Sequence, residues 1–126
     1  MERKTKQREI IYLDICNRYD HPTTEMIYDS VRKRNPSIGL ATVYRTVKVL
    51  TDEGLIQKIT IKDGSVHYDY NRDQHCHLVC TICNTIIDVD INKACEIKKE
   101  IEGFKVLKTD LQIHGICKNC QKKGEN

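Results

Sequence analysis

No stretch of this 126-residue sequence is apolar for long enough to cross a bilayer, which takes about 20 residues. The opening Met1–Lys4 is charged and leads into a polar segment, so it lacks the apolar core of a secretion signal. A nucleophile elbow and a glycine-rich cofactor loop are also missing, which leaves a thiol-dependent, peroxide-reducing enzyme as a distant alternative. We expect a cytoplasmic protein that is not an enzyme and has no membrane partner.

The sequence also lacks a large excess of either charge, since its net charge is +3. Residues 1–72 carry 13 Lys and Arg against 10 Asp and Glu, whereas residues 73–126 carry eight of each. The positive excess therefore lies in the first half, where a surface facing nucleic-acid phosphates would be expected. The length fits one ordinary domain or two very small ones, and a very small domain needs a metal or a partner chain to be stable.

The first half has the pattern of three helices followed by a hairpin. We predict helices over residues 5–17, from the N-cap Thr23 to Arg34, and over 40–53 with Gly54 just past the end. Residues 55–61 and 65–70 are strand-like, and Asp63-Gly64 between them is a strong hairpin signal. Three helices and a two-stranded hairpin, in this order, predict a winged helix-turn-helix.

The third predicted helix has two chemically distinct faces. Its apolar positions, which we expect in the core, are Leu40, Val43, Val47 and Leu50. The opposite face and its flanks carry groups able to bind base edges and phosphates, namely Thr42, Tyr44, Arg45 and Lys48. A basic helix face is usually only a solvated surface, but its place in the winged order predicts that this one binds DNA.

A polar segment at residues 71–74 separates the first half from a second half with a different order of predicted helices and strands. We predict a DNA-binding domain over 1–70, a hinge at 71–74 and a second domain over 75–126. In the second domain we expect strands at 78–80 and 85–90, a helix at about 92–102 ended by Gly103, a strand at 104–114 and a solvated tail. The fold class is therefore α+β.

Seven cysteines in a cytoplasmic chain are more typical of metal ligands or reactive thiols than of disulfides. Cys80 and Cys83 form one CxxC pair, and Cys117 and Cys120 form another. Two such pairs can supply four thiolates around Zn²⁺ at ~2.3 Å. Each pair could instead be a redox pair, although neither lies in a βαβ pattern. We predict a structural Zn²⁺ site, which would also stabilise so small a domain.

A second group of candidate ligands is made of histidines and aspartates. His75 and His77 are two residues apart, so on an extended strand both side chains point to the same face. Asp88 lies on the next predicted strand, while Asp69 and His21 belong to the first half. Imidazoles with carboxylates form a nitrogen–oxygen site that suits Fe²⁺, Mn²⁺ or Zn²⁺.

Four motifs together resemble the ferric uptake regulator family: Leu40-Ala41-Thr42-Val43-Tyr44-Arg45-Thr46, Gly54-Leu55, His75-x-His77-x-x-Cys80-x-x-Cys83 and Gly115-Ile116-Cys117-x-x-Cys120. The match covers essentially the whole chain. The resemblance implies a homodimeric repressor with a winged-helix domain, a C-terminal α/β dimerisation domain and a palindromic operator in double-stranded DNA.

The resemblance also assigns two metal sites. Its structural Zn²⁺ ligands match Cys80, Cys83, Cys117 and Cys120, and its regulatory Fe²⁺ or Mn²⁺ ligands match His21, Asp69, His75, His77 and Asp88. Iron and zinc sensors of the family often carry Glu at the two Asp positions, so this chain is most similar to the peroxide-responsive branch, PerR. That branch loses repression when hydrogen peroxide oxidises its metal site. An iron- or zinc-level-sensing uptake repressor of the same family is the alternative, and Cys76 departs from the family's pattern.

Overall fold

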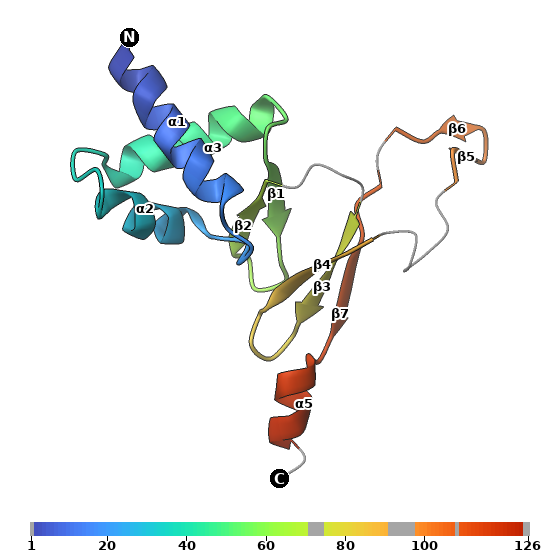
Figure 1. The fold of residues 1–126 in the computed structure, drawn as a ribbon. Coiled ribbons are helices and arrows are strands. Elements are labelled where there is room, and N and C mark those ends of the chain that lie inside the picture. Colours follow the sequence, from blue (N-terminus) through green and yellow to red (C-terminus); the bar gives the residue numbers. More distant parts are fainter. Residues whose placement is uncertain (1, 71–74, 91–97, 108, 125–126) are drawn as a thin grey trace. The chain divides into compact units, whose positions relative to one another are not determined.

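The chain folds into two compact units, Met1–Arg72 and Asp73–Asn126, called here the first and the second unit (Figure 1). The computed structural model describes residues 2–70, 75–90, 98–107 and 109–124. The hinge predicted at 71–74 lies outside these residues. Within them, no helix combines the length and the apolar character that crossing a membrane requires.

The first unit contains three helices and a hairpin, as the sequence pattern predicts. Its elements are α1 (Glu2–Cys16), α2 (Thr24–Arg32), α3 (Leu40–Asp52), β1 (Gln57–Thr60) and β2 (Val66–Asp69). Thr23 is the N-cap of α2, where its hydroxyl accepts a hydrogen bond from the Met26 N–H. β1 and β2 pair antiparallel, and Gly64 takes a φ of 88° in the turn between them. This hairpin is the wing of a winged helix-turn-helix.

The core of the first unit lies between the three helices and the wing. Its buried residues are Ile11, Ile15, Ile27, Val31, Ile38, Val43, Val47, Leu50, Ile56 and Tyr68. The prediction was wrong for Leu40, which is exposed at the first position of α3, while Thr46 is buried on the inner face. The buried residues of α3 begin at Val43, so the first residue of the helix lies outside the core.

The second unit is built on a three-stranded sheet of order β4-β3-β7. Its strands are β3 (His75–Cys80), β4 (Ile86–Asp90) and β7 (Gln112–Gly115); β3 pairs antiparallel with β4 and parallel with β7. A separate hairpin joins β5 (Glu100–Ile101) to β6 (Phe104–Lys105), and α5 (Lys118–Gly124) follows the sheet.

Two expectations for this unit were wrong. The predicted helix does not reach Gly103, because Glu100–Ile101 is a strand and Glu102 and Gly103 take φ values of 51° and 79° in a tight hairpin turn. Residues 91–97 lie outside the described part. The predicted strand over 104–114 is two short strands, β6 and β7. The described part of the predicted solvated tail, up to Gly124, is exposed and belongs to α5.

Candidate metal centres and nucleic-acid interface

The four cysteines of the two CxxC pairs come together at one end of the sheet in the second unit. Cys80 ends β3, Cys83 lies in the turn to β4, Cys117 precedes α5 and Cys120 lies in its first turn. Their Sγ atoms all lie within 4.8 Å of one another. The predicted grouping is therefore present, and it brings together residues more than 30 positions apart in the sequence.

Hydrogen bonds to this cluster favour thiolates at two of the positions. The backbone N–H of Cys117 donates to Cys80 Sγ at 3.4 Å, and such donors lower the pKa of Cys80 to about 6. The Thr85 hydroxyl lies 3.0 Å from Cys83 Sγ and lowers the pKa of that thiol. The pKa of Cys120 is raised to about 12, chiefly by its contact with Cys117. A cation is needed to hold all four as thiolates.

The spacing of the cluster fits Zn²⁺. Four thiolates at ~2.3 Å around one tetrahedral ion lie about 3.8 Å apart. The Sγ atoms of Cys83 and Cys117 are separated by 3.8 Å, and all four cysteines are free of disulfides. Soft sulfur donors in a closed set of four suit a structural zinc ion rather than an iron or manganese ion with an open position.

A second cluster lies within the same unit, on the β3–β4 ribbon. His75 and His77 project from one face of β3, and His77 pairs with Asp88 across the strands. The Nε2 atoms of the two histidines are 3.0 Å apart and lie 3.3 and 3.2 Å from Asp88 Oδ1. Adjacent corners of an octahedron with bonds of about 2.1 Å are about 3.0 Å apart. The three atoms therefore have the spacing of a two-histidine, one-carboxylate face, a set that suits Fe²⁺.

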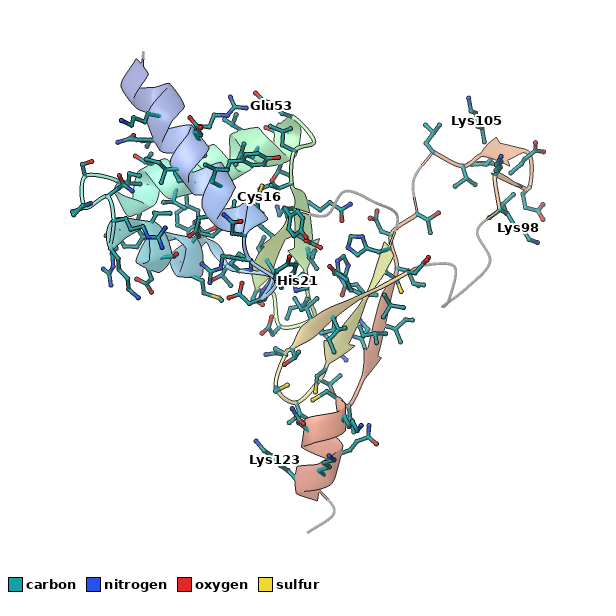
Figure 2. The ribbon with its side chains drawn as sticks, viewed as in Figure 1. Cys16, His21, Glu53, Lys98, Lys105 and Lys123 are labelled. Atoms are coloured by element: carbon teal, nitrogen blue, oxygen red, sulfur yellow. The ribbon has the colours of Figure 1, made fainter. Side chains whose placement is uncertain are left out.

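The two remaining predicted ligands, His21 and Asp69, meet within the first unit. Both side chains are buried, and His21 Nε2 lies 3.6 Å from Asp69 Oδ2. His21, labelled in Figure 2, lies in the loop between α1 and α2. Asp69 is the last residue of β2. His21 has a φ of 50°, a left-handed conformation that costs a residue other than glycine roughly 1–3 kcal/mol and is concentrated at functional sites.

The predicted regulatory ligands thus lie in two sets, with His21 and Asp69 in the first unit and the other three in the second. Nitrogen and carboxylate oxygen donors make both sets harder than the cysteine cluster, which favours Fe²⁺ or Mn²⁺ over a thiol-binding metal. Cys76 lies between the two histidines of β3 and is fully buried. Cys16, in α1, is half-buried, and Cys95 lies outside the described residues.

The side chains predicted to contact DNA lie on α3. Tyr44, Arg45 and Lys48 are exposed, and Thr42 is half-buried. Arg45 donates to the Thr42 hydroxyl at 3.2 Å, Lys48 pairs with Asp52 at 3.2 Å, and the Tyr44 hydroxyl donates to the Glu25 carboxylate of α2. An exposed ion pair such as Lys48–Asp52 contributes little stability, so the Lys48 ammonium can exchange it for a phosphate.

Sequence reasoning missed two residues near His21. Arg18 binds the loop that carries His21, and His67 contacts the His21 main chain. Both contacts depend on how the loop folds back on α2 and the wing, and no short motif marks them.

The chain is similar to known proteins over most of its length. The model of the Ferric uptake regulator family matches residues 2–114. The chain is 30% identical over 125 residues to the peroxide-responsive repressor PerR of Staphylococcus epidermidis, covering 97% of this chain and 83% of that protein. The Campylobacter jejuni peroxide stress regulator aligns with a TM-score of 0.81 at 30% identity, covering 94% of this chain and 91% of that one. A zinc-bound manganese uptake regulator aligns with a TM-score of 0.66 at 29% identity, covering 88% and 87%.

Proposed function

This chain belongs to the ferric uptake regulator family, and we propose that it is a homodimeric repressor that releases its operator when hydrogen peroxide oxidises a bound Fe²⁺ site. Family membership makes it a metal-responsive regulator and not an enzyme. The proposal adds a palindromic double-stranded DNA operator, a cytoplasmic location and the peroxide signal. The relatives named as peroxide-responsive, at 30–32% identity, support the signal.

The observation that carries the proposal is the convergence of His75, His77 and Asp88. Two imidazole nitrogens and one carboxylate oxygen within 3.0–3.3 Å of one another form half of an octahedral site. His21 and Asp69 can supply further nitrogen and oxygen ligands from the first unit. We assign these five residues to one regulatory site on the basis of their ligand chemistry and the family resemblance.

This assignment explains how a metal could control DNA binding. If ligands of both units hold one ion, they favour one relative orientation of the two units. A ligand shifts an equilibrium only by binding one state better than the other, and this site would do so. The favoured orientation would place the two α3 helices of a dimer in successive major grooves, ~34–36 Å apart.

The second unit offers a surface for the dimer. Its sheet carries an apolar pocket of about 270 Å³, lined by residues that include Leu78, Ile87, Ile113 and Ile116. The last three are exposed large hydrophobic side chains in this single chain. Exposed apolar patches of this kind usually mark a protein–protein interface. Zn²⁺ bound by the four cysteines would stabilise the turn and the helix at one end of this surface.

Peroxide sensing needs an oxidisable ligand beside the ion. A bound Fe²⁺ would supply the one-electron chemistry that breaks the O–O bond of hydrogen peroxide, and it would regain that electron from the ligand that is oxidised. In total, the imidazole of His75 or His77 would lose two electrons and gain one oxygen atom, while hydrogen peroxide accepts the two electrons and its other oxygen atom leaves as water. The carboxylates of Asp69 and Asp88 resist this oxidation. An oxidised imidazole binds the ion more weakly, so the preferred orientation of the units is lost and the operator is released irreversibly.

Operator binding by the loaded protein tests the proposal. Duplexes would be selected from a random pool with Mn²⁺-loaded protein, and their affinity measured without oxygen for the Fe²⁺ and Mn²⁺ forms, before and after hydrogen peroxide. We expect both forms to bind, and only the Fe²⁺ form to lose its affinity after peroxide. An Fe²⁺ form that keeps its affinity would identify a sensor of metal concentration instead.

The chain offers a matched pair of variants for this experiment. Asp88→Ala removes a proposed ligand, whereas Glu100→Ala removes an exposed carboxylate of β5 in the same unit. We expect Asp88→Ala to abolish metal-dependent DNA binding and Glu100→Ala to preserve it. Equal DNA binding by the two variants would contradict the assigned regulatory site.

A further inference from the structure

We propose that Arg18 and His67 are positioning residues that hold His21 from two sides in the conformation needed to bind the regulatory ion. This inference rests on the proposed function, because it assigns a role towards the same site. It is carried by the contacts of the loop between α1 and α2, all of which lie within the first unit.

His21 needs such support because of its backbone. Its φ of 50° lies in the left-handed region, which residues other than glycine adopt only when the surrounding structure holds them there. Pro22 follows directly, and its carbonyl accepts a hydrogen bond from the Tyr68 N–H of the wing at 2.9 Å. The loop is thus anchored just after His21, and the conformation of His21 itself depends on its other contacts.

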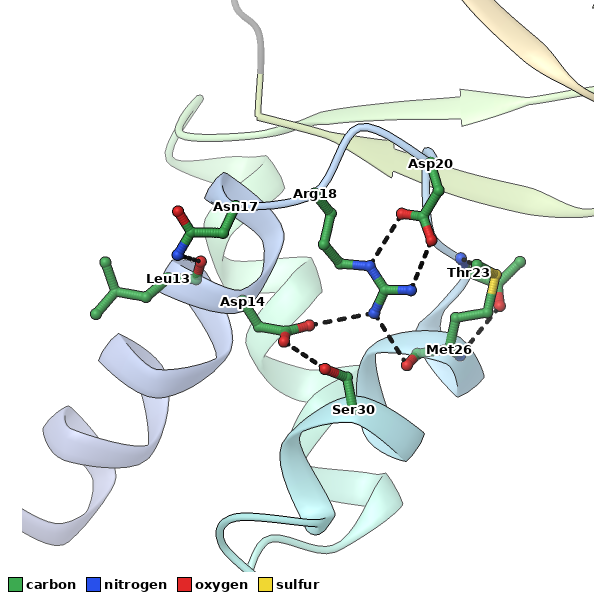
Figure 3. Close-up of polar contacts among 8 residues, drawn as sticks. All are labelled: Leu13, Asp14, Asn17, Arg18, Asp20, Thr23, Met26 and Ser30. Carbon is green, nitrogen blue, oxygen red and sulfur yellow. Dashed lines mark hydrogen bonds and ion pairs between the residues drawn. The ribbon is translucent and has the colours of Figure 1, made fainter.

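Arg18 holds the loop from the side of the helices (Figure 3). Its guanidinium binds both oxygens of Asp20, the residue before His21, at 2.9 and 2.8 Å. The same group donates to Asp14 of α1 at 3.3 Å and to the Met26 carbonyl of α2 at 3.1 Å. Ser30 donates to the other oxygen of Asp14 at 2.6 Å. The planar guanidinium of Arg18 therefore connects the loop to both helices through several hydrogen bonds in fixed directions, which the single ammonium group of lysine cannot reproduce.

His67 holds the loop from the side of the wing. Its Nδ1 lies 2.7 Å from the carbonyl oxygen of His21, and a carbonyl can only accept, so Nδ1 carries the proton and donates. Its Nε2 lies 3.0 Å from the Ser65 hydroxyl, which is itself 2.6 Å from Asp63 Oδ1. Both ring nitrogens of His67 are therefore engaged, and the ring is fixed relative to the wing.

Together these contacts keep the His21 imidazole near Asp69. Without them the loop could leave the left-handed conformation, and the ion would have to restore that conformation when it binds. Residues that orient metal ligands typically change metal affinity by roughly 10–100-fold when they are mutated. We expect losses in this range for the regulatory ion and none for the cysteine cluster, which lies in the other unit.

The test compares two substitutions of His67 in the full-length, zinc-loaded protein. In His67→Asn the side-chain amide N–H can take the place of Nδ1–H, whereas in His67→Gln it lies near the position of Nε2. Mn²⁺ affinity would be measured by competition with a fluorescent chelator, together with zinc content and thermal stability. We expect His67→Gln to bind Mn²⁺ about 10-fold or more weakly and His67→Asn to bind nearly as tightly as wild type.

Two more variants keep the test decisive. Arg18→Lys should weaken Mn²⁺ binding, and Ser65→Ala, a change in the wing turn, should do so by a smaller factor, both with unchanged zinc content. Equal Mn²⁺ affinity in wild type, His67→Gln and Arg18→Lys would overturn this inference while leaving the regulatory site intact. A wild-type protein that binds no Mn²⁺, or whose Mn²⁺ affinity survives Asp88→Ala, would overturn the proposed site as well.

Discussion

The two units of this chain achieve stability in different ways. The first unit buries ten residues in one continuous core, and most of them are Ile, Val or Leu. The described part of the second unit has few buried apolar or cysteine side chains: Cys76, Val79, Cys80, Ile86 and Cys120. It also exposes many large ones: Ile82, Ile87, Ile101, Phe104, Leu107, Ile113 and Ile116.

The difference shows what each unit depends on. A core of branched aliphatic residues can stabilise a small helical domain without a ligand, since each buried side chain contributes about 1.5–3 kcal/mol. The described part of the second unit exposes more large apolar side chains than it buries, and a small unit of this kind needs a metal ion or a partner chain. Two of these five buried apolar or cysteine side chains, Cys80 and Cys120, are themselves proposed zinc ligands. Loss of zinc should therefore unfold the second unit and leave the first unit folded.

Removing zinc should have the largest effect. Cys117→Ser should eliminate zinc binding, unfold the second unit and abolish the dimer, because structural zinc sites contribute roughly 10–16 kcal/mol of apparent binding energy to folding. Hydrogen exchange measured by mass spectrometry should show α1, α2 and α3 still protected while β3, β4 and β7 exchange freely.

Cys16→Ser is the matched control, because this half-buried cysteine lies in α1 and is not part of the cluster. It should retain zinc and the dimer. A zinc-free protein that remains a dimer with a protected sheet would contradict the proposed role of zinc.

A cavity in the core of the first unit should have a smaller effect than loss of zinc, and it should destabilise the first unit instead of the second. Ile27→Ala removes three carbons from a fully buried side chain of α2, which should lower the free energy of unfolding of the first unit by about 2–5 kcal/mol. Zinc content should not change. Ile113→Ala, at an exposed position of the second unit, should leave chain stability nearly unaltered and weaken the dimer. Urea denaturation would measure chain stability, and sedimentation would measure dimer formation. An Ile113→Ala variant that loses chain stability, with an Ile27→Ala variant that keeps it, would contradict the comparison of the two units.

The side chains that contact DNA should lie in the first unit. If Arg45 reads a base edge, Arg45→Ala should weaken operator binding by about 1–3 kcal/mol and relax specificity at one position. Lys48→Ala should weaken binding more evenly across sequences, as the loss of a phosphate contact does. Both variants should form dimers and bind zinc normally. Unchanged affinity in both would show that α3, or this face of it, is not the DNA-reading surface.

The smallest effects should come from two hydroxyl groups, one in each unit. Thr23→Ala removes the N-cap of α2 and should cost about 1 kcal/mol of stability in the first unit, measured by urea denaturation. Thr85→Val removes the hydroxyl that lowers the pKa of Cys83, so it should speed zinc transfer to a chelator without altering the first unit. Equal chelator rates in wild type and Thr85→Val would show that this hydroxyl does not support the zinc site.

The same contrast explains which parts of the fold could be predicted. In the first unit the helix periodicity, the Thr23 cap and the Asp63-Gly64 turn are local signals, and the predicted elements are confirmed within a few residues. In the second unit the region around Gly103 carries competing signals. Glu102 and Gly103 form a hairpin turn, yet a glycine after a segment with a helical pattern equally predicts the end of a helix.

The candidate sites show the same difference between local motifs, which can be predicted, and long-range contacts, which cannot. The CxxC pairs and His75-x-His77 are local motifs, and both groupings are present within the second unit. The contacts of Arg18 and His67 join residues up to 46 positions apart through side-chain geometry, which single-sequence patterns do not encode. The register that sets His77 opposite Asp88 likewise depends on strand pairing.

Mass spectrometry of the Fe²⁺ form after hydrogen peroxide tests the central claim most directly. The protein would be loaded without oxygen, treated with peroxide, digested and mapped, with the Mn²⁺ form as control. We predict the gain of one oxygen atom on His75 or His77, in the Fe²⁺ form only and in proportion to the loss of operator binding. Cys76 offers a competing route, because oxidation of its thiol to a sulfenic acid could be reversed by thiols. Modification confined to Cys76 and reversed by a reductant, or loss of DNA binding with both histidines unmodified, would contradict the histidine mechanism.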